Sequence, residues 1–130
     1  MLKKVFFSLL LLLFLPVLAG EYEDAFKNNY KILMYLTMPE CSYCNKFDKV
    51  YEELTISYGD KVKFLKIDTT TSYGKKLAES FRIKFVPYVI LIEPKKEKGL
   101  VINPDCLLQY TCTENLIKSV LEWLEGAWRV

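Results

Sequence analysis

The chain has 130 residues, 52% of them hydrophobic and 26% charged, which is ordinary for one globular domain and too short for two. Its 18 basic and 16 acidic residues leave no strong positive charge, so nucleic acid is not expected as a partner. It has no histidine, which excludes Cys–His and Ser–His nucleophiles, mixed Cys/His zinc sites and histidine-ligated haem or copper, and leaves four cysteines to carry any covalent chemistry.

The first 19 residues have the pattern of a secretory signal peptide. Lys3-Lys4 precedes an apolar stretch over residues 5–15, and Val17 and Ala19 stand at the −3 and −1 positions of a cleavage site before Gly20. The alternative is an uncleaved membrane anchor, but the stretch is shorter than the roughly 20 residues that a span requires. We therefore predict cleavage, a mature domain over 20–130 and a periplasmic or secreted location, with membrane contact only through an uncleaved leader.

The mature chain alternates helical and strand patterns. Removal of Lys3-Lys4 leaves it with 16 basic and 16 acidic residues. Hydrophobic spacing and turn residues predict a short helix over 21–29, a buried strand over 31–37, a helix over 42–58, a strand over 62–68 and a helix over 72–81.

A hairpin and a last helix complete the pattern. The hairpin strands are 89–92 and 100–102, joined by a charged turn. The last helix is predicted to begin near Thr113 and to end at Gly126. Its expected buried stripe is Leu116, Ile117, Val120, Leu121 and Leu124. This order predicts an α/β fold with a mixed four-stranded sheet flanked by helices on both faces.

Cys41 and Cys44 lie between the first buried strand and the long helix. Unpaired N–H groups and positive partial charge at a helix start favour a thiolate over a thiol. Disulfide exchange needs an accessible attacking thiolate and a second thiol that resolves the mixed disulfide. We expect Cys41, before the helix, to be the exposed attacker, and Cys44, one turn in, to be buried and resolving. A Cys-x-x-Cys pair alone is also half of a zinc site.

The element order, the cysteine pair and a later Val-Pro at a strand start together resemble the thioredoxin-like superfamily. The resemblance covers about residues 31–124 and assigns the same roles to the two cysteines. In that family the proline before the later strand is cis and faces the thiols, which implies that Pro87, after Val86, is cis and substrate-facing. Without the cysteines, an ordinary trans proline would be preferred. Ser42 and Tyr43, also substrate-facing, resemble the Gly-Tyr of periplasmic disulfide isomerases.

Three positions depart from the family pattern. Thioredoxins carry a buried carboxylate where this chain has Tyr35, a lysine where it has Phe64, and usually tryptophan where it has Glu40. Proton transfer at Cys44 would then depend on water or on Glu40. Glu40 is also a candidate modulator of the site, because a nearby carboxylate disfavours the Cys41 thiolate.

Cys106 and Cys112 flank a five-residue segment before the last helix. In an oxidising compartment we expect them to form a structural disulfide. A functional role remains open, since in thioredoxin-like folds this junction lies near the active-site face. A single zinc ion on all four cysteines is a third alternative, with loose spacing for a zinc knuckle.

We predict an exported thiol–disulfide oxidoreductase that reduces or isomerises disulfides through Cys41 and Cys44. Its expected partners are cysteine-containing exported proteins and an upstream redox donor, and no metal or small cofactor is implied. The alternative is a redox-inert binding or metal-handling module of the same fold, in which both cysteine pairs are structural.

Overall fold

The computed structural model describes residues 20–102, 104–107 and 110–125, without the side chains of 104, 105 and 110–114. The predicted leader therefore lies outside the described residues. The helices are α2 (Glu21–Lys27), α3 (Ser42–Tyr58), α4 (Ser72–Ser80), the 3₁₀ turn η1 (Pro94–Lys96), α5 (Pro104–Leu107) and α6 (Tyr110–Leu124). The strands are β1 (Ile32–Thr37), β2 (Lys63–Asp68), β3 (Tyr88–Glu93) and β4 (Lys98–Ile102).

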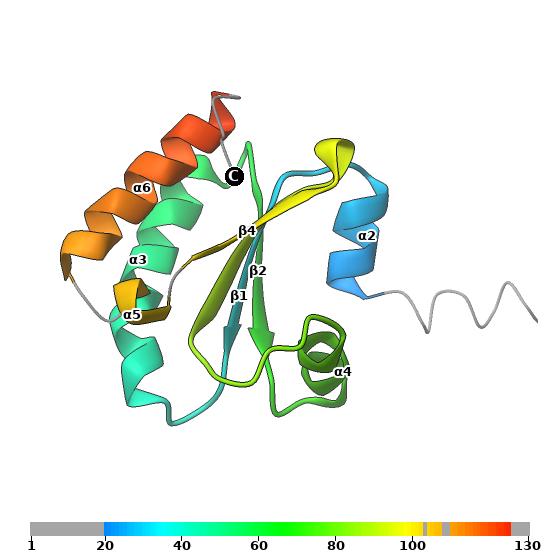
Figure 1. Ribbon diagram of the computed structural model, residues 1–130, viewed down its shortest axis with the longest axis vertical. Helices are drawn as coiled ribbons and strands as arrows, with labels where there is room; N and C mark the ends of the chain where they lie inside the picture. The colour runs from blue at the N-terminus through cyan, green and yellow to red at the C-terminus, as the bar shows by residue number, and fades with distance from the viewer. Residues whose placement is uncertain (1–19, 103, 108–109, 126–130) are drawn as a thin grey trace, which may run out of the picture.

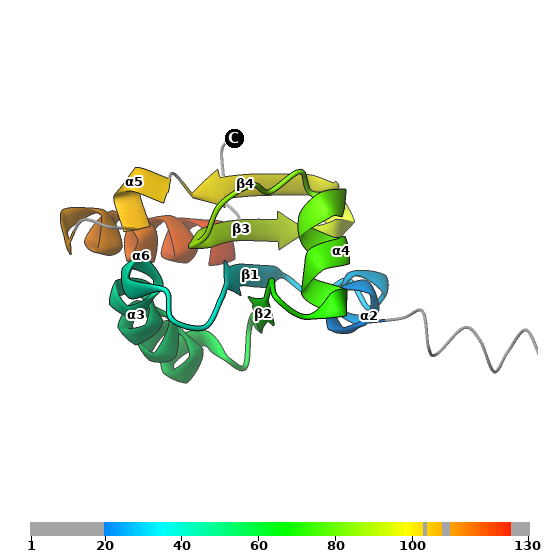
Figure 2. The same cartoon turned by 90° about the horizontal axis from the view of Figure 1, so that it is seen from below.

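The strands form one mixed sheet in the order β2-β1-β3-β4. β1 and β2 are parallel, with α3 between them in the chain, and β3 is antiparallel to both β1 and β4. The sheet is the middle of three layers: α3 and α6 cover one face, while α2 and α4 cover the other (Figure 1, Figure 2). This is the predicted architecture.

Central strand β1 separates two hydrophobic cores. All six of its residues are buried because helices cover both faces of the sheet. Side chains alternate along a strand, so Leu33 and Tyr35 point into the core under α3 and α6, and Met34 and Leu36 point into the core under α2 and α4. Tyr35 is thereby aimed at the helix that carries the cysteines.

Most predicted elements lie within one or two residues of the observed ones, and α3 has the predicted bounds. The exception is the C-terminal part. The last helix begins at Tyr110 instead of near Thr113, and α5 precedes it without having been predicted. Leu121 was wrongly placed in the buried stripe: it is 40% exposed, whereas Trp123 is fully buried. Residues two apart lie on nearly opposite sides of a helix, so only one of these two side chains can face the core.

Within the described residues, no helix is both long enough and apolar enough to cross a membrane. The predicted helix end at Gly126 lies outside the described residues.

Candidate active site

Cys41 is the N-cap of α3 and is disulfide-bonded to Cys44. Their Cα atoms are 5.2 Å apart, and the Cys41 Sγ accepts a hydrogen bond of 3.1 Å from the backbone N–H of Cys44. This N–H is one of the first-turn donors that have no partner inside a helix. The cap therefore uses sulfur where a serine or aspartate oxygen usually stands, and it places Cys41 at the positive end of the helix dipole.

Both cysteines are buried in this disulfide form. The exposed fraction is 6% for Cys41 and 1% for Cys44. Cys44 is more buried than Cys41, as expected, but the expectation of an exposed Cys41 is wrong. Both sulfurs belong to the core under α3 and α6, and Val86 packs against the same core. Cys41 is thus covered on its inner side and reaches solvent through a small opening.

Val86 and Pro87 lie at the same end of the central strands as the disulfide. Tyr88, at the start of β3, pairs with Leu36 near the end of β1, and this register brings the preceding Val86-Pro87 beside the loop that leads to Cys41. The peptide bond between them is cis, as the family resemblance implied. Pro87 is buried and Val86 half-buried.

Exposed side chains surround the disulfide, and we call Met38, Glu40, Ser42, Tyr43 and Phe85 the rim. Three of these are large and apolar, with exposed fractions of 42% for Met38, 60% for Tyr43 and 53% for Phe85. Glu40 has a left-handed backbone conformation, with φ of 59°, which costs a non-glycine residue about 1–2 kcal/mol. Glu40 is exposed and directly precedes Cys41 in the chain.

A hollow of about 360 Å³ adjoins the rim. Rim residues Met38 and Phe85 line it together with Thr69, Ala78, Ile83, Lys84 and Val86. Its walls come from the end of β1, the start and end of the α4 segment, and the residues before the cis-proline. Neither cysteine lines the hollow, but rim residues Met38 and Phe85 do, so it gives an apolar side chain a place next to the rim.

Beneath the disulfide lies a set of residues that we call the floor: buried Tyr35, Cys44 and Phe47, and half-buried Asp48. The hydroxyl of Tyr35 is 2.8 Å from Oδ1 of Asp48 and 3.0 Å from the backbone carbonyl oxygen of Cys44. Burial raises the pKa of Tyr35, so its hydroxyl is a hydrogen-bond donor at every physiological pH. Its ring packs edge-on against Phe47, with centroids 4.7 Å apart.

Asp48 and Lys66 are site residues that the sequence analysis missed. Lys66 Nζ is 3.4 Å from Oδ1 of Asp48 and 5.9 Å from the ring centroid of Tyr35. Helical spacing could have found Asp48, four residues after Cys44, and strand alternation could have found Lys66, two residues after Phe64 on the same face. The structure brings an acidic and a basic group to Tyr35, under the turn of α3 that carries Cys44, from other positions than those of the family pattern.

The second cysteine pair lies partly outside the described residues. Cys106, in α5, is half-buried and disulfide-bonded, and it packs against the core that holds Cys41 and Cys44. The side chain of Cys112, its predicted partner, is among those outside the description. Their pairing therefore stays a prediction.

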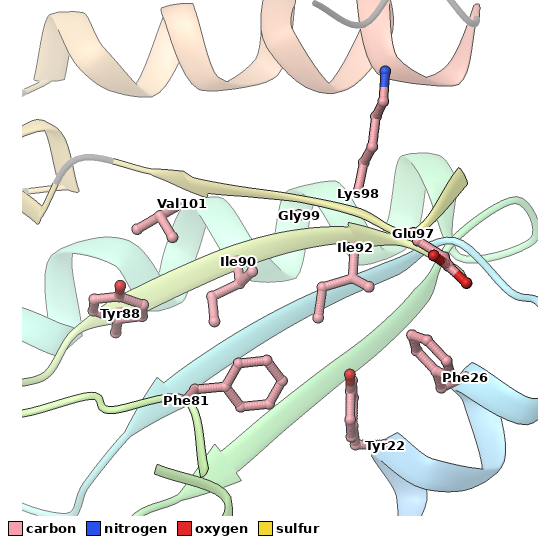
Figure 3. Close-up of a pocket in the computed structure, with 10 residues that line it drawn as sticks. All are labelled: Tyr22, Phe26, Phe81, Tyr88, Ile90, Ile92, Glu97, Lys98, Gly99 and Val101. Atoms are coloured by element: carbon pink, nitrogen blue, oxygen red, sulfur yellow. The ribbon is translucent and has the colours of Figure 1, made fainter. Parts of the chain in front are cut away.

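A larger hollow, of about 440 Å³, lies on the opposite face of the sheet (Figure 3). Its apolar walls are Tyr22 and Phe26 of α2, Phe81 after α4, and Ile90, Ile92 and Val101 of the β3–β4 hairpin. Neither cysteine of the α3 disulfide lines it, so it is separate from the candidate redox site.

Comparison with known proteins gives the family and the fold. Residues 14–105 match the family model described as Thioredoxin. The chain is similar to solved structures of a malarial protein (25% identity, 69% of this chain and 96% of that chain, TM-score 0.53) and of oxidised thioredoxin O2 from Arabidopsis thaliana (21%, 80% and 86%, 0.57). It is also similar to the first thioredoxin domain of mouse protein disulfide-isomerase A4 (18%, 86% and 77%, 0.63). No curated protein matches.

The family match covers well over half of the chain, and the structural neighbours share its fold. The Cys-x-x-Cys pair at the start of α3, closed as a disulfide, supports a general thiol–disulfide oxidoreductase activity. The chain therefore belongs to the thioredoxin family.

Proposed function

We propose that this protein is an exported thiol–disulfide oxidoreductase that reduces or isomerises disulfides of other exported proteins. The observation that carries the proposal is the Cys41–Cys44 disulfide at the N-cap of α3, with the Cys44 N–H directed at the Cys41 sulfur. A donor that already faces this sulfur stabilises negative charge on it when the disulfide opens.

The reduced pair would act in two steps. The Cys41 thiolate attacks one sulfur of a substrate disulfide, which forms a Cys41–substrate disulfide and releases the other substrate sulfur as a thiolate that takes a proton from water. The Cys44 sulfur, after losing its proton, then attacks the Cys41 sulfur. The Cys41–Cys44 bond forms, the second substrate thiol leaves, and the substrate has gained two electrons. In isomerisation the substrate leaves earlier, when one of the substrate's own thiols attacks the Cys41–substrate disulfide.

The rim supports a protein substrate. Met38, Tyr43 and Phe85 expose apolar surface around the disulfide, and the adjoining hollow accepts an apolar side chain. Exposed apolar surface beside a reactive group is typical of a binding site for a polypeptide. We infer that an extended or unfolded segment with a cysteine lies across this surface.

Glu40 supports reduction over oxidation. Strong oxidants of this kind have a stabilised reduced form, because a stable thiolate makes the disulfide easy to reduce. A carboxylate next to Cys41 opposes that thiolate and so favours a more reducing pair. In an oxidising compartment, reduction requires electrons from an upstream donor, which we expect to be another thiol–disulfide protein.

The test combines thiol trapping with insulin reduction. Cys44→Ser should accumulate mixed disulfides through Cys41, and Cys41→Ser should accumulate none, while Ser42→Ala, which keeps both thiols, should behave like the wild type. Titration with dithiothreitol followed by alkylation should reduce the Cys41–Cys44 pair before the second pair. Equal trapping by both cysteine variants would contradict the assigned roles. Two equally resistant pairs, or one bound zinc per chain, would instead support the binding or metal-handling alternative.

Export is tested separately. Expression of the full chain in a Gram-negative host should yield a periplasmic product whose mass is that of a chain beginning at Gly20. A product that retains residues 1–19 and sediments with membranes would show that the leader is an uncleaved membrane anchor. Neither outcome depends on the redox assay.

A further inference from the structure

Three side chains from three elements meet beneath Cys44. Tyr35 comes from β1, Asp48 from α3 and Lys66 from β2, and the Asp48 carboxylate touches both of the others, at 2.8 Å and 3.4 Å. Tyr35 also contacts the backbone carbonyl of Cys44, at 3.0 Å. The three side chains therefore form one continuous polar cluster that ends at the turn of α3 that carries the resolving cysteine.

The cluster runs from the backbone of buried Cys44 to solvent. Cys44 is 1% exposed and Tyr35 is fully buried, whereas the side chains of Asp48 and Lys66 are 29% and 47% exposed. Asp48 follows Cys44 by four residues in α3, so the two side chains share one face of the helix with Cβ atoms about 5–6 Å apart. A partly exposed carboxylate is thus held one helical turn from a sulfur that water hardly reaches.

The hydrogen bonds hold the Asp48 carboxylate in place. The Tyr35 hydroxyl has one proton and faces two acceptors, the Asp48 carboxylate and the Cys44 carbonyl. Lys66 contacts the same carboxylate and balances its charge. The carboxylate is therefore held between two partners beside the turn of α3 that carries Cys44.

The charge of Asp48 bears on Cys44. A carboxylate one helical turn away, in a partly buried setting, disfavours a second negative charge at the sulfur. Burial of the sulfur acts in the same direction. The Asp48 carboxylate therefore opposes a thiolate at Cys44.

We propose that the Tyr35–Asp48–Lys66 cluster couples the charge of Asp48 to the ionisation of Cys44, with Asp48 as a positioning residue for the resolving step. The resolving step itself rests on the proposed function. Cys44 gives its proton to water and attacks the Cys41 sulfur of a mixed disulfide, while Lys66 offsets the Asp48 charge. The new S–S bond forms, the bond to the substrate breaks, and the substrate sulfur leaves with the electron pair and takes a proton from water.

The other titratable groups near Asp48 are few. Tyr35 faces it from β1 and Lys66 from β2, while Tyr51 and Glu52 lie three and four residues further along α3. Glu52 is eight residues from Cys44, about 12 Å along the helix axis, and it is exposed. It is therefore the natural charge control for Asp48, just as buried Tyr51 is the natural hydroxyl control for Tyr35.

The experiment follows the ionisation of Cys44 by thiolate absorbance in a Cys41→Ser background, where Cys44 lacks its disulfide partner. Adding Asp48→Asn should move the midpoint of the Cys44 titration down by about one pH unit. Adding Lys66→Gln should move it up, because the carboxylate loses its counter-charge. Adding Tyr35→Phe should move it down by less than Asp48→Asn, because an untethered carboxylate turns toward solvent. Glu52→Gln and Tyr51→Phe should leave it within about 0.2 unit.

In otherwise wild-type protein, the pH profile for release of a preformed mixed disulfide should shift with the same signs. A Cys44 titration that is the same with Asp48→Asn as with Glu52→Gln would overturn the coupling. Thermal unfolding of each variant separates a folding defect from an electrostatic effect, since a merely structural role cannot give opposite shifts for Asp48→Asn and Lys66→Gln. The titration needs no enzymatic turnover: a shift without insulin reduction would keep the coupling and refute the proposed function.

Discussion

Tyr43 on the rim and Tyr35 on the floor show how differently the two sides of one disulfide are built. Tyr43 lies in the first turn of α3 and is 60% exposed, whereas Tyr35 is fully buried and contacts the same turn of α3 from the central strand. The rim consists of residues near the cysteines in sequence, together with Phe85 from the cis-proline loop. All floor residues lie within nine residues of Cys44 in sequence, but Tyr35 comes from the central strand, and Lys66 of β2 contacts the floor from a distant segment.

The difference separates two tasks. Most floor groups are buried, so a change in one of them alters charge and packing at Cys44 strongly. Rim groups stay in contact with water, so a change in one of them has a smaller effect on stability and acts mainly on what the site binds or on the charge beside Cys41. Four predictions test this division, ordered from the largest expected effect to the smallest.

Truncation of the floor should be the most damaging. Phe47 is 1% exposed and packs edge-on against Tyr35, so Phe47→Ala removes a buried ring and leaves a cavity beneath Cys44. We expect a loss of about 3–5 kcal/mol in the free energy of unfolding of the oxidised protein, measured in urea. Ile56→Ala on the same helix, where the side chain is 86% exposed, should stay within about 0.5 kcal/mol. A cost below about 1.5 kcal/mol for Phe47→Ala would show that the floor is not tightly packed.

Alkaline pH should destabilise the fold through the buried tyrosines. Burial, with a smaller effect of the Glu21 charge, raises the pKa of Tyr51 to about 12, and burial also raises that of Tyr35. Unfolded tyrosines ionise near pH 10, so this contribution to stability is complete below pH 10 and falls as pH rises toward 12. Each tyrosine should cost about 1.4 kcal/mol per pH unit in that range. Urea unfolding at pH 9, 10 and 11 measures the loss.

Tyr51→Phe removes one of these ionisable hydroxyls and so measures its contribution. Its free energy of unfolding should fall less steeply between pH 10 and 11 than that of the wild type, by the contribution of a single tyrosine. Equal slopes for the two proteins would mean that Tyr51 ionises as easily in the folded state as in the unfolded one.

Glu40 tests charge against backbone conformation on the rim. Glu40→Gly relieves the left-handed backbone and should raise stability by about 0.5–1 kcal/mol after the added flexibility of the unfolded chain is subtracted. Glu40→Gln removes the charge but keeps the side chain, so it should leave stability nearly unchanged and make the disulfide more oxidising. Glu97→Gly, at another left-handed position with φ of 49°, should raise stability without changing the reduction potential. An unchanged potential in Glu40→Gln would exclude Glu40 as a modulator.

The apolar rim should matter for substrates alone. Phe85→Ser should raise KM for a protein disulfide several-fold, leave kcat and the reaction with a small aromatic disulfide unchanged, and change stability by less than about 0.5 kcal/mol. Val101→Ser, at a 47% exposed position on β4 and not part of the rim, is the matched control and should leave KM unchanged. A rise in KM of equal size for both variants would remove the rim from substrate binding.

Sequence reasoning performed well where local patterns control the outcome. The apolar run of β1 and the helical spacing from Phe47 to Leu54 predicted their elements closely, and the cysteine spacing placed Cys41 before the helix and Cys44 within it. Local spacing was insufficient to predict the buried face of α6, where the predicted stripe included Leu121 and omitted Trp123. On an amphipathic helix with several apolar residues, the packing partners decide which ones face the core.

The sequence by itself determined the α/β order, the position of the thiol pair at a helix N-terminus and the proline that borders it. These depend on residue type and short-range spacing, which act before any tertiary contact forms. Only the tertiary structure decided that Cys41 is covered, and that Asp48 and Lys66 meet at the Tyr35 hydroxyl. Such a cluster joins three elements through the register of β1 with β2 and the packing of α3 on both strands. The replacement of one family carboxylate by Tyr35 was visible in the sequence, but the carboxylate that contacts its hydroxyl was not.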